Sequence, residues 1–253
     1  MSPIIIYIIG GFTAGVVTGL VGLSAATIIA PLFITVLGMD PYTAIGIALA
    51  SDVLASALSA FNYIQHKNIS LKSAAVMGTA VIVFTILGSI FSRQTDPTNL
   101  GGMINIFVVF LGLRFLIYPV KDRPNAKIFA FTKSKFLLSL IWGTIIGMIS
   151  GYFGAGGGLS MLAVLTIVLG YDLKTGVGTS VFIMTGTAFV GAAAHIIIGG
   201  TLWLPLAITC VAALIGANLS SLYANKVDTV FLNKVIGSTL VVYGITLVTI
   251  YFI

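Results

Sequence analysis

The sequence contains no glutamate and very few charges of either sign. Its six aspartates and twelve lysines and arginines make up 7% of the 253 residues, whereas soluble domains carry about 25% charged residues. So few charges cannot cover a surface that faces water. Because 58% of the residues are hydrophobic, lipid must surround most of the surface, and an integral membrane protein is predicted.

Cysteine is nearly absent, and the basic residues do not form a stripe with aromatic residues. The single Cys210 excludes an intrachain disulfide and a relay of two thiols. No nucleic-acid partner is predicted, because five of the twelve basic residues fall between Lys121 and Lys135, as is typical of a cytoplasmic loop. The first residues, up to Gly19, lack a basic start and a clear cleavage site, so we expect them to belong to the mature protein.

The chain is built from two similar halves. A shift of 132 residues aligns the halves without a gap. We predict a first transmembrane repeat at 1–120, a cytoplasmic basic linker at 121–135 and a second transmembrane repeat at 136–253. The shift superimposes Gly11, Gly15, Gly19, Gly22, Asp40, Thr43 and Gly46 on Gly143, Gly147, Gly151, Gly154, Asp172, Thr175 and Gly178.

Each half starts with two short apolar arms around a glycine cluster, and three longer apolar runs follow. The arms form either one broken spanning helix, with parallel halves, or a hairpin that returns to its own side, with inverted halves. A single helix of about 35 residues would be about 52 Å long, far more than a bilayer core of about 30 Å. The hairpin also leaves only Arg93 outside when the linker is cytoplasmic. It places on the cytoplasmic side Lys67, Lys72, Lys174, Lys226 and Lys234.

We therefore predict an all-α polytopic membrane protein made of two inverted-topology repeats. Each repeat is a Gly-rich broken or re-entrant helical hairpin plus three spanning helices, which gives about 8–10 membrane segments. The hairpin tips approach from opposite faces and meet near the midplane, as in secondary transporters. Re-entrant hairpins and pairs of short tilted spans both fit this pattern.

The two glycine tips are the candidate substrate site. A helix start exposes unpaired N–H groups and a partial positive charge, and glycines let a ligand approach the backbone closely. This combination suits an anion held without a buried cationic side chain. The substrate-binding residues of the tips are predicted to be Gly22, Ser24, Gly154, Gly156, Gly157, Gly158 and Ser160. Helix packing is the alternative role, and we favour it for Gly11, Gly15, Gly143 and Gly147, which recur every four residues.

Polar residues near the starts of the next runs complete this prediction. The hydroxyls of Ser51, Thr179 and Ser180 are candidates for the substrate cage, although such hydroxyls often bond back to their own helix. Asp52 is the only carboxylate deep within an apolar run. Because a buried acid in a membrane is functional by default, we assign Asp52 to a proton or to another coupling ion.

The second tip resembles the signature of the sulfite exporter TauE/SafE family, also called the toluene sulfonate uptake permease family. The signature residues are Gly147, Ser150, Gly151, Gly154 and Gly156–Gly158, followed by Gly178-Thr179-Ser180. The first half departs from it, with Ser24-Ala25-Ala26 in place of the glycine run. The resemblance covers nearly the whole chain and implies transport of a small sulfur-containing anion, such as sulfite, thiosulfate or a sulfonate, across a prokaryotic inner membrane.

Our leading hypothesis is a secondary transporter that works by alternating access, with no enzyme activity, cofactor or metal. A small-anion channel is the first alternative. An intramembrane hydrolase using Ser160 and His195 is a weaker one, because no third group that orients the histidine is visible. A purely structural subunit leaves the glycine clusters unexplained. The expected partners are the anion, the lipid bilayer and a coupling ion, and a homodimer is compatible with the sequence.

Overall fold

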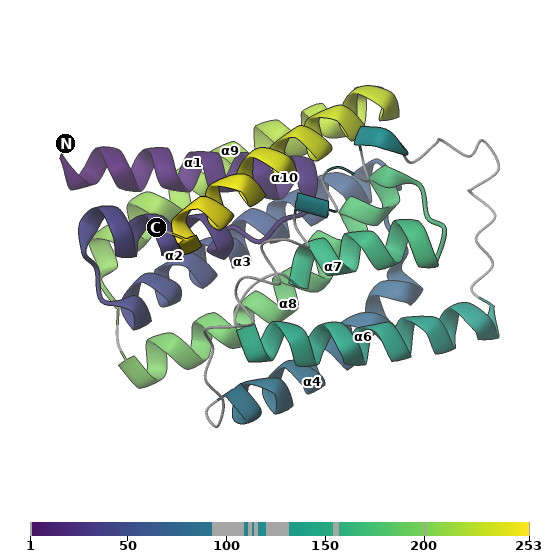
Figure 1. Ribbon diagram of the computed structural model, residues 1–253, viewed down its shortest axis with the longest axis horizontal. Helices are drawn as coiled ribbons and strands as arrows, with labels where there is room; N and C mark the ends of the chain where they lie inside the picture. The colour runs from purple at the N-terminus through teal and green to yellow at the C-terminus, as the bar shows by residue number, and fades with distance from the viewer. Residues whose placement is uncertain are drawn as a thin grey trace.

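The computed structural model describes residues 2–92, 109–110, 113, 116–119, 132–153, 157–199 and 201–252. Within these ranges all regular structure is helical (Figure 1), so the all-α prediction is confirmed. The first half contains α1 (Pro3–Val21), α2 (Ala26–Leu37), α3 (Pro41–Gln65) and α4 (Leu71–Ser92). The second half contains α6 (Lys133–Phe153), α7 (Gly157–Ala163), the π-helix η1 (Val164–Val168), α8 (Leu173–Gly199), α9 (Trp203–Lys226) and α10 (Thr229–Phe252).

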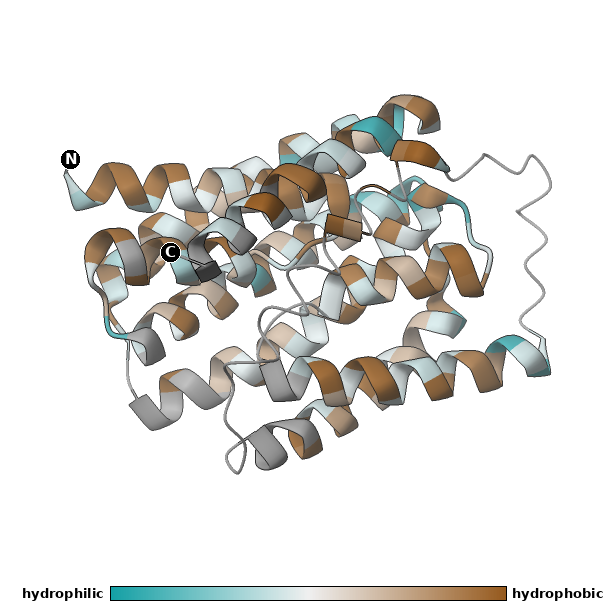
Figure 2. Ribbon diagram, in the orientation of Figure 1, coloured by the Kyte–Doolittle hydropathy of each residue, from teal (hydrophilic) through white to brown (hydrophobic). Residues whose placement is uncertain are grey.

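Several of these helices have the length and composition of membrane spans. In the described part of the chain, five qualify: Pro3–Val21, Thr43–Gln65, Leu173–Ala193, Trp203–Lys226 and Thr229–Thr246. Figure 2 shows these helices brown, and therefore hydrophobic, over much of their length. Large apolar side chains such as Phe61 and Leu219 are exposed. Apolar outer surfaces agree with a polytopic membrane protein, since lipid is the medium that favours them.

The helix bounds repeat between the halves. Helices α1, α2, α3 and α4 have counterparts in α6, α7, α8 and α9, each of which begins 130–132 residues later. The starts of α3 and α8 also share a cap: Asp40 accepts a hydrogen bond from the Thr43 N–H, and Asp172 accepts one from the Thr175 N–H, both at 2.9 Å. Of the predicted linker 121–135, residues 121–131 lie outside the described residues.

The second arm of each hairpin is short. Helix α2 has 12 residues, and α7 with its continuation η1 has 7 and 5 residues. At 1.5 Å per residue each arm is about 18 Å long, which is less than a bilayer core of about 30 Å. Neither arm is long enough to cross the hydrocarbon core as a straight helix.

Glycines bring α1 and α9 into close contact. A Cβ added at Gly11 would lie 2.6 Å from the carbonyl oxygen of Thr209, and one added at Gly19 would lie 2.7 Å from that of Ala217. These contacts advance in the same order along both helices, so α1 and α9 run parallel.

Helices α4 and α6 pack in the same way. A Cβ at Gly143 would lie 2.8 Å from the Met77 carbonyl oxygen, and one at Gly147 would lie 2.6 Å from the Val81 carbonyl oxygen, so this pair is also parallel. The packing role is thus confirmed for the four glycines to which we assigned it, Gly11, Gly15, Gly143 and Gly147.

Helix α3 lies between α8 and α9. It runs parallel to α9, since Ser51 Oγ lies 3.5 Å from Cys210 Sγ and Asn62 Nδ2 donates to Ser221 Oγ at 2.8 Å.

The order of contacts is reversed between α3 and α8. Thr185 Oγ1 donates to Ser56 Oγ at 3.2 Å, whereas a Cβ at Gly178 would lie 2.8 Å from Tyr63 Cβ. The two helices are therefore antiparallel.

Lysines gather at one end of the bundle. Asn68, between α3 and α4, donates to Asn225 Oδ1 near the end of α9 at 2.6 Å, and Lys174 Nζ donates to the Asn225 carbonyl oxygen at 3.0 Å. We call this the lysine end; it lies on the right in Figure 1 and carries Lys67, Lys72, Lys135, Lys174 and Lys226. Helices α1, α3 and α9 run towards it, and α4, α6 and α8 run away from it.

The packing of α4 against α6 predicts a difference between two glycine-to-alanine variants. Gly147→Ala should destabilise the protein by about 1–2 kcal/mol, because overpacking outweighs a gain of about 1 kcal/mol in helix propensity. Gly186→Ala on α8 meets only the terminal methyl of Ile82, at 3.3 Å, and should be neutral or stabilising. The stability of both variants can be measured in detergent as the temperature at which half of the monodisperse size-exclusion peak is lost. Equal midpoint temperatures for the two variants would contradict the packing role of Gly147.

Candidate functional site

The first tip begins where α1 ends. Gly22 has a φ of 71°, in the left-handed region, and its N–H donates to the Thr18 carbonyl oxygen at 2.9 Å. A Cβ at Gly22 would also lie 2.5 Å from Ser180 Oγ on α8. Gly22 is therefore required both by its backbone conformation and by the closeness of α8.

The two tips touch one another. A Cβ added at Gly158, near the start of α7, would lie 2.5 Å from the Gly22 carbonyl oxygen and 3.3 Å from the Ser24 nitrogen. Together with the contact of Ser180, this brings four of the candidate residues into one place: Gly22, Ser24, Gly158 and Ser180. Gly154 and Gly156 lie outside the described residues.

A carboxylate of the chain itself occupies the start of α2. Asp52, on α3, is 1% exposed; it accepts a hydrogen bond from Ser24 Oγ at 2.5 Å and one from the Ala25 N–H at 2.9 Å. An anion at a helix N-terminus is favoured by the free N–H groups and by the helix dipole. The first tip thus already holds the kind of group that we expected it to bind.

The second tip has a different neighbour at the corresponding place. The shift of 132 residues carries Asp52 onto Met184, whose Sδ would lie 2.6 Å from a Cβ at Gly158. A thioether is a weak hydrogen-bond acceptor and carries no charge. The two tips therefore share a backbone plan but differ in charge.

Ser150 was part of the family signature but was not among our candidate site residues. Its Oγ is buried and has no hydrogen-bond partner in the described part of the chain. A Cβ at Gly157 would lie 2.6 Å from this Oγ, so the hydroxyl faces the start of α7. A buried hydroxyl without a partner is costly, which makes Ser150 a further candidate ligand at the second tip.

Two of the remaining candidate hydroxyls, those of Ser51 and Thr179, have partners outside the tips. Ser51 Oγ donates to the Ile47 carbonyl oxygen at 2.9 Å, and Thr179 Oγ1 accepts the Ser70 N–H at 3.0 Å. Ser160 is half-buried on α7. The His195 side chain lies outside the described residues, and among those that are described no group of three or more histidine, cysteine, aspartate or glutamate residues could hold a metal ion.

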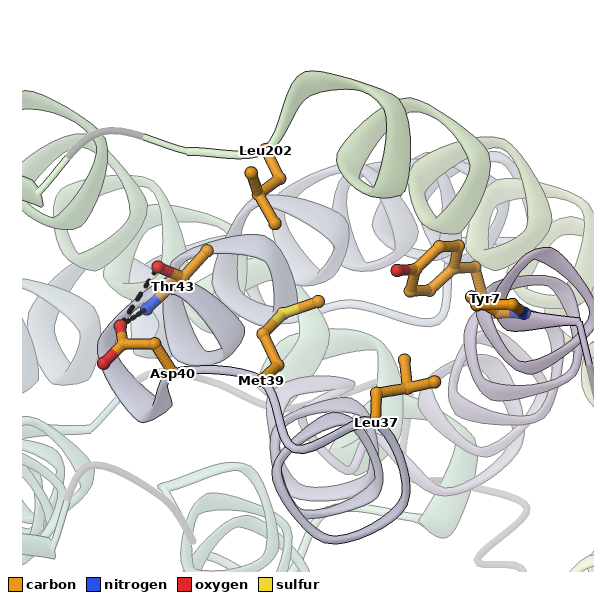
Figure 3. A pocket seen from close by; sticks show the side chains of 7 residues that line it. Tyr7, Leu37, Met39, Asp40, Thr43 and Leu202 are labelled. Atoms are coloured by element: carbon orange, nitrogen blue, oxygen red, sulfur yellow. Dashed lines mark hydrogen bonds between the residues drawn. The ribbon is translucent and has the colours of Figure 1, made fainter.

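A pocket opens at the end of the bundle opposite the lysine end. Its volume is about 360 Å³, and Figure 3 shows Asp40 turned to its capping partner Thr43 on one side of it. The pocket lies where α1 and α3 begin and α2 ends. Its lining consists of Pro3, Tyr7, Leu37, Met39, Asp40, Thr43 and Leu202.

Comparison with known proteins confirms the family resemblance. The family model described as sulfite exporter TauE/SafE matches residues 7–247. Two Bacillus subtilis proteins are similar over nearly their whole length: "Probable membrane transporter protein YunE" (24% identical, 96% of this chain and 97% of the relative) and "Probable membrane transporter protein YdhB" (25%, 93% and 96%).

An archaeal relative is similar over a smaller share of both chains. It is "Probable membrane transporter protein MJ0441" of Methanocaldococcus jannaschii (27%, 75% and 71%). No solved structure matches the chain. A family match over almost the entire sequence, together with the five helices of spanning length in the described part of the chain, identifies a multi-pass cell membrane protein, and the chain belongs to the sulfite exporter TauE/SafE family of membrane transporters.

Proposed function

We propose that the protein is a secondary transporter that carries a small sulfur-containing anion by alternating access and binds it at the second glycine tip. The observation that carries this proposal is the contact between the tips at Gly22 and Gly158. Discontinuous helices that meet inside a membrane bundle are the usual substrate sites of secondary transporters. The family description and the names of the relatives support a transport function. The family description, sulfite exporter, also suggests a sulfur oxyanion as the substrate.

The charge of the site favours an anion at the second tip. At the first tip the Asp52 carboxylate accepts the Ser24 hydroxyl and the Ala25 N–H. At the second tip the uncharged Met184 lies beside Gly158, near the start of α7, and the Ser150 hydroxyl lies beside Gly157. Sulfite, thiosulfate and sulfonates each present oxygens that accept several such hydrogen bonds.

The helix directions support inverted repeats. Three helices run opposite to their counterparts in the other half: α1 to α6, α3 to α8 and α4 to α9. The lysine end then corresponds to the cytoplasmic side, as the positive-inside rule requires. In an inverted pair, rocking one half against the other alternately exposes a central site to the two faces of the membrane.

Flux measurements test the second tip. A Cβ at Gly158 would lie 2.5 Å from the Gly22 carbonyl oxygen and 2.6 Å from Met184 Sδ, so the added methyl must push the two tips apart. Gly158→Ala should therefore lower sulfite or thiosulfate uptake into proteoliposomes about tenfold, the factor that corresponds to an overpacking cost of about 1.4 kcal/mol. Gly186→Ala is the matched control on α8 and should transport as the parent does.

The same vesicles separate a transporter from a channel. Saturation of the uptake rate and accelerated exchange against substrate inside the vesicles are expected of alternating access, whereas a linear rate without exchange indicates a channel. Full uptake by a folded Gly158→Ala protein would remove the second tip as the anion site.

Asp52 is the proposed coupling residue, because it is buried beside the tips. Asp52→Asn keeps the shape of the side chain and removes its charge, so uptake should lose its response to an imposed pH gradient while substrate exchange continues. Asp40→Asn, at the exposed cap of α3, is the control and should respond as the parent does. A gradient response that survives in Asp52→Asn would exclude Asp52 as the coupling group.

A further inference from the structure

Tyr171 ties the connection between η1 and α8 to the start of α4. Its backbone N–H donates to the Leu165 carbonyl oxygen at 2.9 Å, and its side chain is 2% exposed. The phenolic oxygen lies 3.0 Å from Ser70 Oγ and 2.7 Å from Ser73 Oγ. One aromatic side chain therefore joins two segments that lie about 100 residues apart in the sequence, by two hydroxyl hydrogen bonds.

A third helix reaches the same side chain. Lys135 Nζ, on the first turn of α6, lies 4.7 Å from the centroid of the Tyr171 ring, within the range of a cation–π contact. The Ser70 N–H also donates to Thr179 Oγ1 on α8. We call Tyr171, Ser70, Ser73 and Lys135 the Tyr171 latch. It connects α4, α6 and the start of α8 at the lysine end.

The other repeat has the same backbone plan but no such latch. The shift of 132 residues carries Tyr171 and Ser70 onto Met39 and Leu202. It carries Ser73 and Lys135 onto Pro205 and Pro3. None of these four replacements has a side-chain N–H or O–H group, so the hydrogen bonds of the latch cannot form there.

This difference coincides with a difference in shape. Pro3, Met39 and Leu202 line the open pocket of about 360 Å³ at the end opposite the lysine end. Figure 3 shows Met39 and Leu202 directed into this pocket. At the lysine end the corresponding place is filled by the buried ring of Tyr171. Equivalent positions of the two repeats are thus closed at one end of the molecule and open at the other.

We propose that the Tyr171 latch is the gate of the lysine end, and that release of Tyr171 from Ser70 and Ser73 opens that end during the transport cycle. The proposal rests on the alternating access proposed above. The structure is then the form in which the lysine end is closed. For the start of α8 to leave α4 and α6, the two hydroxyl hydrogen bonds, the ring–ammonium contact and the hydrogen bond from the Ser70 N–H to Thr179 Oγ1 must all break.

Cysteine accessibility measures this gate without any substrate. In a Cys210→Ala background, Ser180→Cys places a fully buried reporter beside Gly22. A membrane-impermeant maleimide added at the lysine end should label it slowly. Tyr171→Phe keeps the ring but removes the hydroxyl, and it should raise the labelling rate about tenfold, as expected for the loss of two hydrogen bonds in a closed state.

Two further variants separate gating from a general loss of packing. Tyr7→Phe changes the tyrosine at the opposite end, where the ring packs against Phe33, and should leave the labelling rate at the lysine end unchanged. Ser73→Ala should raise this rate by itself but add little to Tyr171→Phe, since both remove the same hydrogen bond. Ser73→Ala also carries the test if Tyr171→Phe is not recovered folded.

The outcomes distinguish the gate from the transport function. Unchanged labelling in Tyr171→Phe and Ser73→Ala, or an equal rise in Tyr7→Phe, would overturn the latch even if the parent protein transports sulfite. Faster labelling in the latch variants supports the gate even if sulfite and thiosulfate flux is absent, and only the proposed substrate then fails.

Discussion

The structure depends on how hydrogen bonds are satisfied where its helices start inside the bundle. Such a start leaves N–H groups that water cannot reach and lipid cannot satisfy, so side chains or ligands must accept from them. At α2 the acceptor is Asp52, which reaches across from α3 to the Ala25 N–H and the Ser24 hydroxyl. This contact both completes α2 and fixes the first tip against α3. It is also why we propose the start of α7, and not that of α2, as the place for an external anion.

Close packing at glycines holds together the helices that carry the two tips. Gly11 and Gly19 let α1 approach the backbone of α9, and Gly143 and Gly147 let α6 approach that of α4, so the helices of both pairs pack closely. Helix α8 also lies close to the end of α1, where Ser180 contacts Gly22. In a bilayer, where apolar surface gains nothing by leaving lipid, such backbone contacts are a main source of helix association.

Much of the fold was readable from spacing alone, and the departures have physical causes. The repeated spacing of Asp40 and Thr43 in Asp172 and Thr175 was visible in the sequence, and in the structure both aspartates cap the starts of α3 and α8. The partner of Asp52 was not predictable, since Ser24 lies 28 residues away and the link exists only after the hairpin folds against α3. The Tyr171 contacts were missed for a similar reason, since Ser73 lies 98 residues away in the sequence. Met39, the counterpart of Tyr171 in the other repeat, has no hydroxyl group that could form the same hydrogen bonds.

The two halves share the order and spacing of their helices, whereas the side chains at equivalent places differ. If Asp52 were matched by a second carboxylate in place of Met184, both tips would hold an anion of the chain and neither would accept a substrate. With one carboxylate only, a substrate anion at the second tip lies close to Asp52, since Gly158 contacts the segment that Asp52 holds. Two neighbouring negative charges repel strongly inside a membrane, so anion binding and neutralisation of Asp52 must favour one another. By thermodynamic linkage, the anion changes the affinity of Asp52 for a proton by the same factor by which the proton changes the affinity of the site for the anion. The proposed coupling of an anion to a proton therefore follows from the difference in charge between the two tips.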